Sequence, residues 1–284
     1  MRETSVMDIK KILVPLDASI YTEGATETAC RIAQAHQAEI AGVAVLDSPE
    51  IRSSVIPAIG PYYPMMVDAV HAKIKHAEQV LEESLQRFAK TCEEAGVKHF
   101  ETEYEGIPAT KLLESSIFFD LVVLGLETSF HFETRGGRGD TLDKMLDNTA
   151  TPILAVPPTG MGSPQRVLVT FDGSFGSSRA LRDFLIMAKP FDPEITILTA
   201  ELKPEKSEFL LENARNLLTS HGFSKVEIVA REESVEKAVD DAMLDGMDLV
   251  VAGIHSRHRI KDLFVGSFAT KLIKRGDTAL FLSH

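Results

Sequence analysis

The chain alternates short, largely apolar runs with longer amphipathic stretches, and it passes through this series of runs twice. In the first half, runs that predict strands cover residues 12–16, 40–46, 98–104, 121–125 and 152–156. In the second half, they cover residues 167–171, 195–200, 225–230, 249–253 and 279–282. Runs without polar alternation are typical of strands covered on both faces. Each half therefore predicts five strands, most of them buried.

The stretches between these strands have the apolar spacing of helices. Helices rich in alanine follow the first strand of each half, and further helices are predicted near residues 66–95, 108–117, 205–221 and 234–244. Strands that alternate with helices favour right-handed crossovers and a parallel sheet covered on both faces. The sequence thus predicts an α/β fold of two tandem Rossmann-like domains, each with a doubly wound, mainly parallel five-stranded sheet.

The repeat also predicts the domain boundaries. With 284 residues, the chain has a natural length for two domains, placed at residues 1–157 and 165–284. The segment 158–164, rich in proline, glycine and serine, is typical of a linker. The first domain carries an apolar, proline-rich insertion near residues 47–73. Two readings stay open: this insertion covers a ligand in the first domain, or it packs over its own domain or the other one.

In open parallel sheets, ligands bind beyond the carboxyl ends of the strands, where the strand order reverses. Asp17 and Gly125 stand at such ends in the first half, and Asp172 and Gly253 stand there in the second. The repeat therefore predicts two crevices, one in each half.

The second half has the features of a phosphate loop. Gly253 and Ser256 are followed by nine residues and then by Gly266 and Ser267, which opens a helix. Glycine lets the backbone approach a ligand closely, and a helix N-terminus presents unpaired N–H groups to an anion. The competing interpretation is an ordinary loop with a serine N-cap.

The first half departs from this pattern. Gly125 and Thr128 are followed by ten residues and then by Gly139 and Asp140, so an acid takes the place of the serine. Two like charges about 4 Å apart cost about 4 kcal/mol at an effective dielectric constant of about 20. We therefore expect this site to be degenerate. The intervening Arg135–Arg138 segment is either a different anion site or a solvated loop.

Composition narrows the partners and the compartment. The formal net charge of −12 argues against a nucleic-acid surface, which needs clustered cations. Cys30 and Cys92 lack metal-ligand spacing and are expected to be buried small side chains in a reducing cytoplasm. The N-terminus lacks the apolar core of a signal peptide, and no run approaches the length of a membrane span. His71 and His76, five residues apart on a predicted helix, are expected at the surface.

Over essentially its whole length, the chain resembles two tandem domains of the universal stress protein family. Nucleotide-binding members have an Asp at the end of the first strand, and later a Gly, two residues, a Gly, nine residues and Gly-Ser or Gly-Thr. Asp172, Gly253, Gly266 and Ser267 match this pattern, whereas Ser256 stands where the second Gly is usual. Thr170 replaces a frequent Pro, which the first half keeps as Pro15.

The resemblance implies an adenine nucleotide, ATP or else ADP or AMP, often with Mg²⁺. It implies that adenine and ribose lie at the ends of the first two strands and that the phosphates lie at the glycine loop. The binding residues expected in the second half are Thr170, Asp172, Ala200, Ala252, Gly253, Ser256, Gly266, Ser267 and Phe268. The degenerate site of the first half comprises Pro15, Asp17, Gly125, Thr128, Gly139 and Asp140.

The resemblance also implies a pseudo-dimer formed through the last strands, residues 152–156 and 279–282, and leaves further homodimerisation open. The function expected is a nucleotide-binding module of a stress response. Two alternatives remain: a slow ATPase or other nucleotide hydrolase, and a nucleotide-free scaffold with an apolar ligand in the first domain. The chain lacks a Walker A lysine pattern and a G-x-G-x-x-G after a strand, so at most weak hydrolysis is expected.

Overall fold

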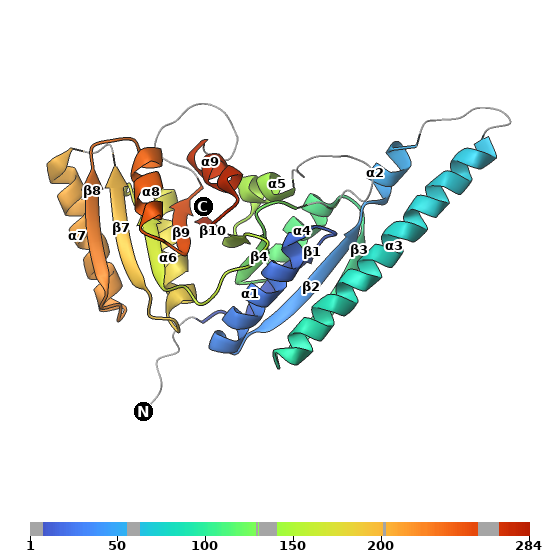
Figure 1. Ribbon diagram of the computed structural model, residues 1–284, viewed down its shortest axis with the longest axis horizontal. Helices are drawn as coiled ribbons and strands as arrows, with labels where there is room; N and C mark the ends of the chain where they lie inside the picture. The colour runs from blue at the N-terminus through green and yellow to red at the C-terminus, as the bar shows by residue number, and fades with distance from the viewer. Residues whose placement is uncertain (1–7, 56–62, 129, 131–140, 201–202, 255–266) are drawn as a thin grey trace.

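The computed structural model describes residues 8–55, 63–128, 130, 141–200, 203–254 and 267–284. The strands of these residues form one ten-stranded sheet in the order β3-β2-β1-β4-β5-β10-β9-β6-β7-β8 (Figure 1). All neighbours are parallel except β5 and β10, which are antiparallel. Each half therefore has the same strand order, and the halves meet along their last strands.

The element bounds confirm the predicted strand–helix alternation. The first half comprises β1 (Lys11–Leu16), α1 (Tyr21–His36), β2 (Glu39–Leu46), α2 (Ser48–Ser53), α3 (Tyr63–Glu94), β3 (His99–Glu105), α4 (Pro108–Ser116), β4 (Leu121–Gly125), α5 (Thr141–Asn148) and β5 (Ile153–Val156). The second half comprises β6 (Arg166–Thr170), α6 (Phe175–Ala188), β7 (Glu194–Ala200), α7 (Pro204–Ser220), β8 (Val226–Arg231), α8 (Val235–Leu244), β9 (Leu249–Gly253), α9 (Ser267–Arg275) and β10 (Ala279–Ser283). The predicted fold class is confirmed.

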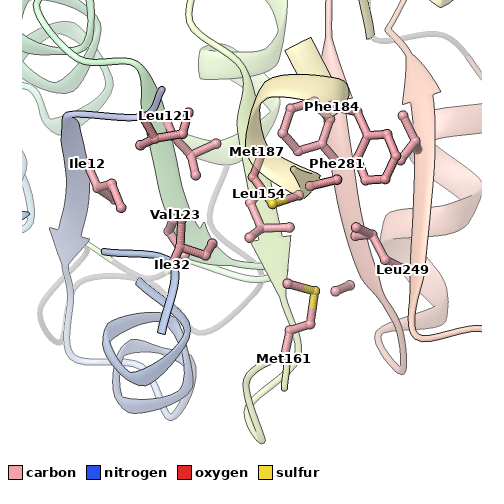
Figure 2. Packing of buried hydrophobic residues seen from close by; sticks show 14 of the residues in the cluster. Ile12, Ile32, Leu121, Val123, Leu154, Met161, Phe184, Met187, Leu249 and Phe281 are labelled. Atoms are coloured by element: carbon pink, nitrogen blue, oxygen red, sulfur yellow. The ribbon is translucent and has the colours of Figure 1, made fainter. Parts of the chain in front are cut away.

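One apolar core crosses the boundary between the halves. On the face covered by α1, α3, α6 and α7, a single buried cluster includes Ile12 of β1, Leu154 of β5 and Phe281 of β10. Figure 2 shows Leu154 beside Met187 and Phe281. The rings of Phe184 and Phe281 meet edge to face, with centroids 6.0 Å apart. The pseudo-dimer expected from the last strands is thus held by packing as well as by strand pairing, while a further homodimer stays a prediction.

The insertion of the first half is mostly helical where the structure describes it. Residues 48–53 form α2, which was not predicted, and α3 begins at Tyr63 instead of near residue 66. Ile51 packs against Ala77 and Leu81 of α3, which agrees with the packing interpretation for this part of the insertion. Residues 56–62 lie outside the described residues. His71 and His76 are exposed on α3, as expected.

An aspartate stabilises the start of the first strand in each half. The Asp120 carboxylate accepts hydrogen bonds from the backbone N–H groups of Lys10 and Lys11, at 2.8 and 2.9 Å. The Asp248 carboxylate accepts in the same way from the backbone N–H groups of Gln165 and Arg166, at 2.9 and 2.8 Å, where β6 begins. Both aspartates lie at the amino ends of the strands, away from the predicted crevices, so the repeat at these positions serves the fold.

The segment predicted as a linker docks on α1. The Thr28 hydroxyl accepts a hydrogen bond from the Met161 N–H at 2.8 Å, and Arg31 donates to the Met161 carbonyl at 2.6 Å. A Cβ on Gly24 would lie 2.4 Å from the carbonyl oxygen of Pro158, so only glycine permits this approach. The connection between the halves is therefore held against the helical layer, although the exact domain boundaries remain a prediction.

A buried histidine joins the ends of α1 and α6. The His36 Nε2 atom lies 2.9 Å from the carbonyl oxygen of Met187, and the ring packs edge to face on Phe191. His36 is 5% exposed, and its Nδ1 atom has no hydrogen-bond partner among the described residues. Burial lowers the pKa of His36 by more than the Met187 carbonyl raises it. A neutral ring that donates from Nε2 fits this environment.

This geometry predicts an acid-dependent loss of stability. Because the pKa of His36 is lower in the folded state, the unfolded chain takes up a proton first, below about pH 6.5. The free energy of unfolding should therefore fall as the pH drops from about 8 to about 5.5. Urea unfolding at several pH values measures this slope. His36→Gln should flatten it, whereas the same change at the exposed His221 should leave it intact; an unchanged slope in the His36 variant would contradict the assignment.

Candidate functional site

The two aspartates predicted at the strand ends are held by the beginning of the next helix. The Asp17 Oδ1 atom accepts hydrogen bonds from the Ser19 N–H at 3.1 Å, the Ser19 hydroxyl at 2.7 Å and the Thr22 hydroxyl at 2.5 Å. The same carboxylate atom of Asp172 accepts from the Ser174 N–H at 2.9 Å and the Ser177 hydroxyl at 2.7 Å. One oxygen of each carboxylate thus fixes the turn from strand to helix.

Two glycines let these helix starts approach the neighbouring strand. A Cβ on Gly253 would lie 2.5 Å from the carbonyl carbon of Gly176 and from the nitrogen of Ser177, at the start of α6. A Cβ on Gly125 would lie 2.2 Å from the Cβ of Tyr21, at the start of α1. The glycine at the end of β4 and β9 is thus required by close packing. The structure brings Asp17 to the strand end beside Gly125, and Asp172 to the end beside Gly253.

The space above these strand ends differs between the halves. In the first half, Tyr21 stands over Gly125, and Phe130 is fully buried in the same face of the core. Asp17 is 3% exposed, and Val45 and Gly125 are also buried. The strand ends of the first half are therefore covered more closely than those of the second, although Asp17 and Ser19 also line a groove between α1 and α3.

In the second half, the position equivalent to Tyr21 is Gly176. Asp172, Gly253 and Ala200 are all partly exposed, in contrast to their buried counterparts in the first half. Phe268, in the first turn of α9, is also partly exposed. The described residues of the second half thus leave their strand ends accessible.

Other predicted site residues are buried in the framework. The Thr170 hydroxyl donates to the Val251 carbonyl at 3.0 Å and so joins β6 to β9. This bond gives Thr170 a structural role that Pro15 cannot have. Ala252 is 1% exposed within the core. Both therefore belong to the framework beneath the strand ends of the second half.

The remaining predicted site residues lie in or next to the two segments that precede α5 and α9. Ser256, Gly266, Gly139 and Asp140 lie outside the described residues, and Ser267 is described only as the first residue of α9. In the first half, Thr128 is buried, and its hydroxyl has no partner among the described residues.

A salt bridge places α9 against α8. The Lys271 ammonium lies 2.9 Å from a carboxylate oxygen of Glu236, and this contact lowers the pKa of Glu236. Arg275 also contacts Asp240 of α8. Two cations of α9, both beyond its first turn, are thereby paired with acids of α8. The sequence repeat did not predict these pairs.

The described residues give no direct support for a protein-bound metal ion. In the described part of the chain, no three His, Cys, Asp or Glu side chains gather as a metal site would require. Nor does any helix in that part combine the length and apolar character needed to cross a bilayer. The Mg²⁺ expected from the resemblance stays a prediction.

The glycine contacts predict a stability effect. In Gly253→Ala, the added methyl group would lie 2.5 Å from backbone atoms of α6, so the helix start must move. We expect a loss of about 1–3 kcal/mol in the free energy of unfolding, as for other overpacked positions. Gly162→Ala is the matched control, because an added Cβ there meets no atom within 4 Å. Urea unfolding of both variants measures the difference, and equal stabilities would show that the close approach is not rigid.

The comparisons with known proteins agree with this architecture. Residues 8–157 and 164–282 each match the universal stress protein family. The universal stress protein Slr1230 of Synechocystis is 23% identical over 216 residues, which cover 74% of each chain. The universal stress protein MJ0531 of Methanocaldococcus jannaschii is 30% identical over 150 residues, 52% of this chain and 81% of that one.

A solved structure shows the same fold over nearly the whole chain. The crystal structure of a universal stress protein from Archaeoglobus fulgidus has a TM-score of 0.71 at 18% identity, and the match covers 96% of this chain and 97% of that one. Both halves of the sheet have thus been matched to one family. The chain belongs to the universal stress protein family, as two domains in tandem.

Proposed function

We propose that this protein binds one adenine nucleotide in the crevice of its second half. The base and ribose lie beside the ends of β6 and β7, at Asp172 and Ala200, and the phosphates lie at the start of α9. The single observation that carries the proposal is the difference between the halves: Asp172, Gly253 and Ala200 are partly exposed, and their counterparts are buried.

The helix start supports the phosphate assignment. The first N–H groups of a helix lack partners within the helix, and the macrodipole favours an anion there. α9 begins at Ser267. Of its three cations, Lys271 and Arg275 are paired with α8, and Lys274 lies in the last turn, away from the helix start. The attraction for phosphates therefore comes from backbone N–H groups and from the residues that precede the helix.

The fixed aspartate supports the ribose assignment. One oxygen of the Asp172 carboxylate is held by Ser174 and Ser177, which orients the group at the mouth of the crevice. A carboxylate accepts hydrogen bonds from ribose hydroxyls, as acidic residues do in dinucleotide-binding sheets of the Rossmann type. Membership of the universal stress protein family, which includes nucleotide-binding proteins, agrees with this reading.

The sequence has neither a Walker A lysine pattern nor a G-x-G-x-x-G after a strand. We propose that nucleotide occupancy acts as a signal in a stress response, in the cytoplasm, and that any hydrolysis is weak. Titration calorimetry with ATP, ADP and AMP, with and without Mg²⁺, tests the binding step. Absence of binding at millimolar nucleotide would remove the proposal and leave a nucleotide-free scaffold.

A charge introduced at the helix start should weaken binding. Ser267→Asp gives the second half the acid that the first half carries at Asp140. We expect the Kd for ATP to rise by at least about tenfold, because a tenfold change requires only about 1.4 kcal/mol of repulsion. Ser267→Ala is the control that removes the hydroxyl without adding charge, and it should bind far more tightly than the Asp variant. Equal affinities of the two variants would exclude the electrostatic argument.

Filling the second crevice should also abolish binding. Gly176→Tyr introduces the side chain that the first half has at Tyr21, over Gly125. We expect the stoichiometry to fall from one nucleotide per chain to none, with the fold retained, because the first half accommodates a tyrosine at this position. Phe175→Tyr is the matched control, since Phe175 is 79% exposed. Unchanged binding by the Gly176 variant would place the nucleotide elsewhere.

A further inference from the structure

The only two cysteines of the chain meet in the core of the first half. Cys30 lies on α1 and Cys92 lies near the end of α3, 62 residues later. Their sulfur atoms are 3.7 Å apart, and the two residues are 4% and 0% exposed. A disulfide needs a sulfur separation of about 2.05 Å, so the sulfur atoms would have to approach by a further distance of about 1.7 Å.

The second half provides an internal comparison. Leu185 of α6 occupies the position of Cys30 in the repeat. Leu218 occupies the position of Cys92. The Leu218 carbonyl accepts the N–H of Phe223, and the Cys92 carbonyl accepts the N–H of Val97, each five residues further along the chain. Both leucines belong to the buried core. The same helix pair thus carries two leucines in one half and two touching thiols in the other, although two leucines fill more volume.

A groove lies on the same pair of helices as the thiols. It has a volume of about 440 Å³ and runs between α1 and α3, with Thr26, Phe88 and Thr91 in its lining. Thr26 precedes Cys30 by one helical turn, and Phe88 precedes Cys92 by the same interval. The groove thus lies about one helical turn from each cysteine along its helix, and neither cysteine lines it.

The electrostatic surroundings separate the two thiols. The hydrogen bond between the sulfur atoms lowers the pKa of Cys30, and nearby Arg31 acts in the same direction, while burial opposes both. The same sulfur contact, together with burial, raises the pKa of Cys92. These opposite directions favour Cys30 as the attacking thiol and Cys92 as the resolving thiol.

We propose that Cys30 and Cys92 form a reversible dithiol–disulfide couple, oxidised by a peroxide, that covalently joins α1 to α3. The Cys30 thiolate attacks one oxygen of the peroxide, the O–O bond breaks, and hydroxide leaves, which produces a sulfenic acid. The Cys92 sulfur then attacks the sulfenic sulfur, loses its proton, and releases water. Overall, two thiols and one hydrogen peroxide give one disulfide and two waters.

The crosslink would act on the elements that organise the first half. α1 holds Asp17 through Thr22 and holds the connecting segment through Thr28. α3 belongs to the layer that covers β2, where the Cβ position of Gly42 faces the ring of Phe88. Oxidation therefore fixes the helical layer over the outer strands of the first half and leaves the second half, with its leucine pair, unchanged.

Hydrogen peroxide added to the folded, reduced full-length protein tests this proposal. After quenching, the chain is unfolded in guanidinium with iodoacetamide and weighed by mass spectrometry. We expect a monomer that has lost the mass of two hydrogen atoms and carries no label, and that takes up two labels after reduction by dithiothreitol. Hydrogen exchange should slow in α1 and α3 on oxidation and stay unchanged in α6 and α7.

Two variants complete the test. Cys30→Leu combined with Cys92→Leu introduces the pair of the second half, and its hydrogen exchange should not respond to peroxide. Cys30→Ala retains one thiol and should give no internal crosslink. The proposal is overturned if peroxide leaves both thiols open to alkylation, if it yields sulfinic acid on one cysteine or disulfide-linked dimers, or if the crosslink forms faster in the unfolded chain than in the folded one.

Discussion

The antiparallel pairing of β5 with β10 determines the architecture of the chain. Three residue pairs across this boundary join two five-stranded sheets into one. The apolar cores on both faces continue across it, while His36 and the docked connection hold the same boundary in the helical layer. Because strands are parallel within each half and antiparallel across the boundary, each half keeps its own carboxyl ends and builds its own crevice.

The periodicity of the sequence was sufficient to predict the strands and most helices. Strands covered on both faces must be apolar along their length, so the pattern that predicts them is the one that the core requires. The sequence does contain a start signal for α2, which was not predicted. Asp47 caps this helix by accepting the Glu50 N–H, and a proline lies in its first turn. α3 likewise begins with a proline next to its first residue, where no hydrogen bond is lost.

Contacts between distant elements could not be predicted from the same pattern. The spacing places Tyr21 on a helix, but nothing in it says that the side chain stands over Gly125. Likewise, burial of Phe130 in the first half and the contact of His36 with Met187 depend on the packing of particular helices. The repeat predicted which positions are equivalent, and only the structure shows that equivalent positions are covered in one half and accessible in the other.

Two separate differences distinguish the halves, and in the proposed function they concern different parts of a nucleotide. In the proposed function, Asp140 in place of Ser267 opposes phosphate by charge, whereas Tyr21 covers Gly125 at the strand ends, where a base and ribose would lie. Both changes leave the supporting framework intact: the aspartate still holds the helix start, and the glycine still permits its approach. Because the framework is independent of the groups above it, one copy of a duplicated domain can lose its ligand while it continues to stabilise the other through the shared sheet.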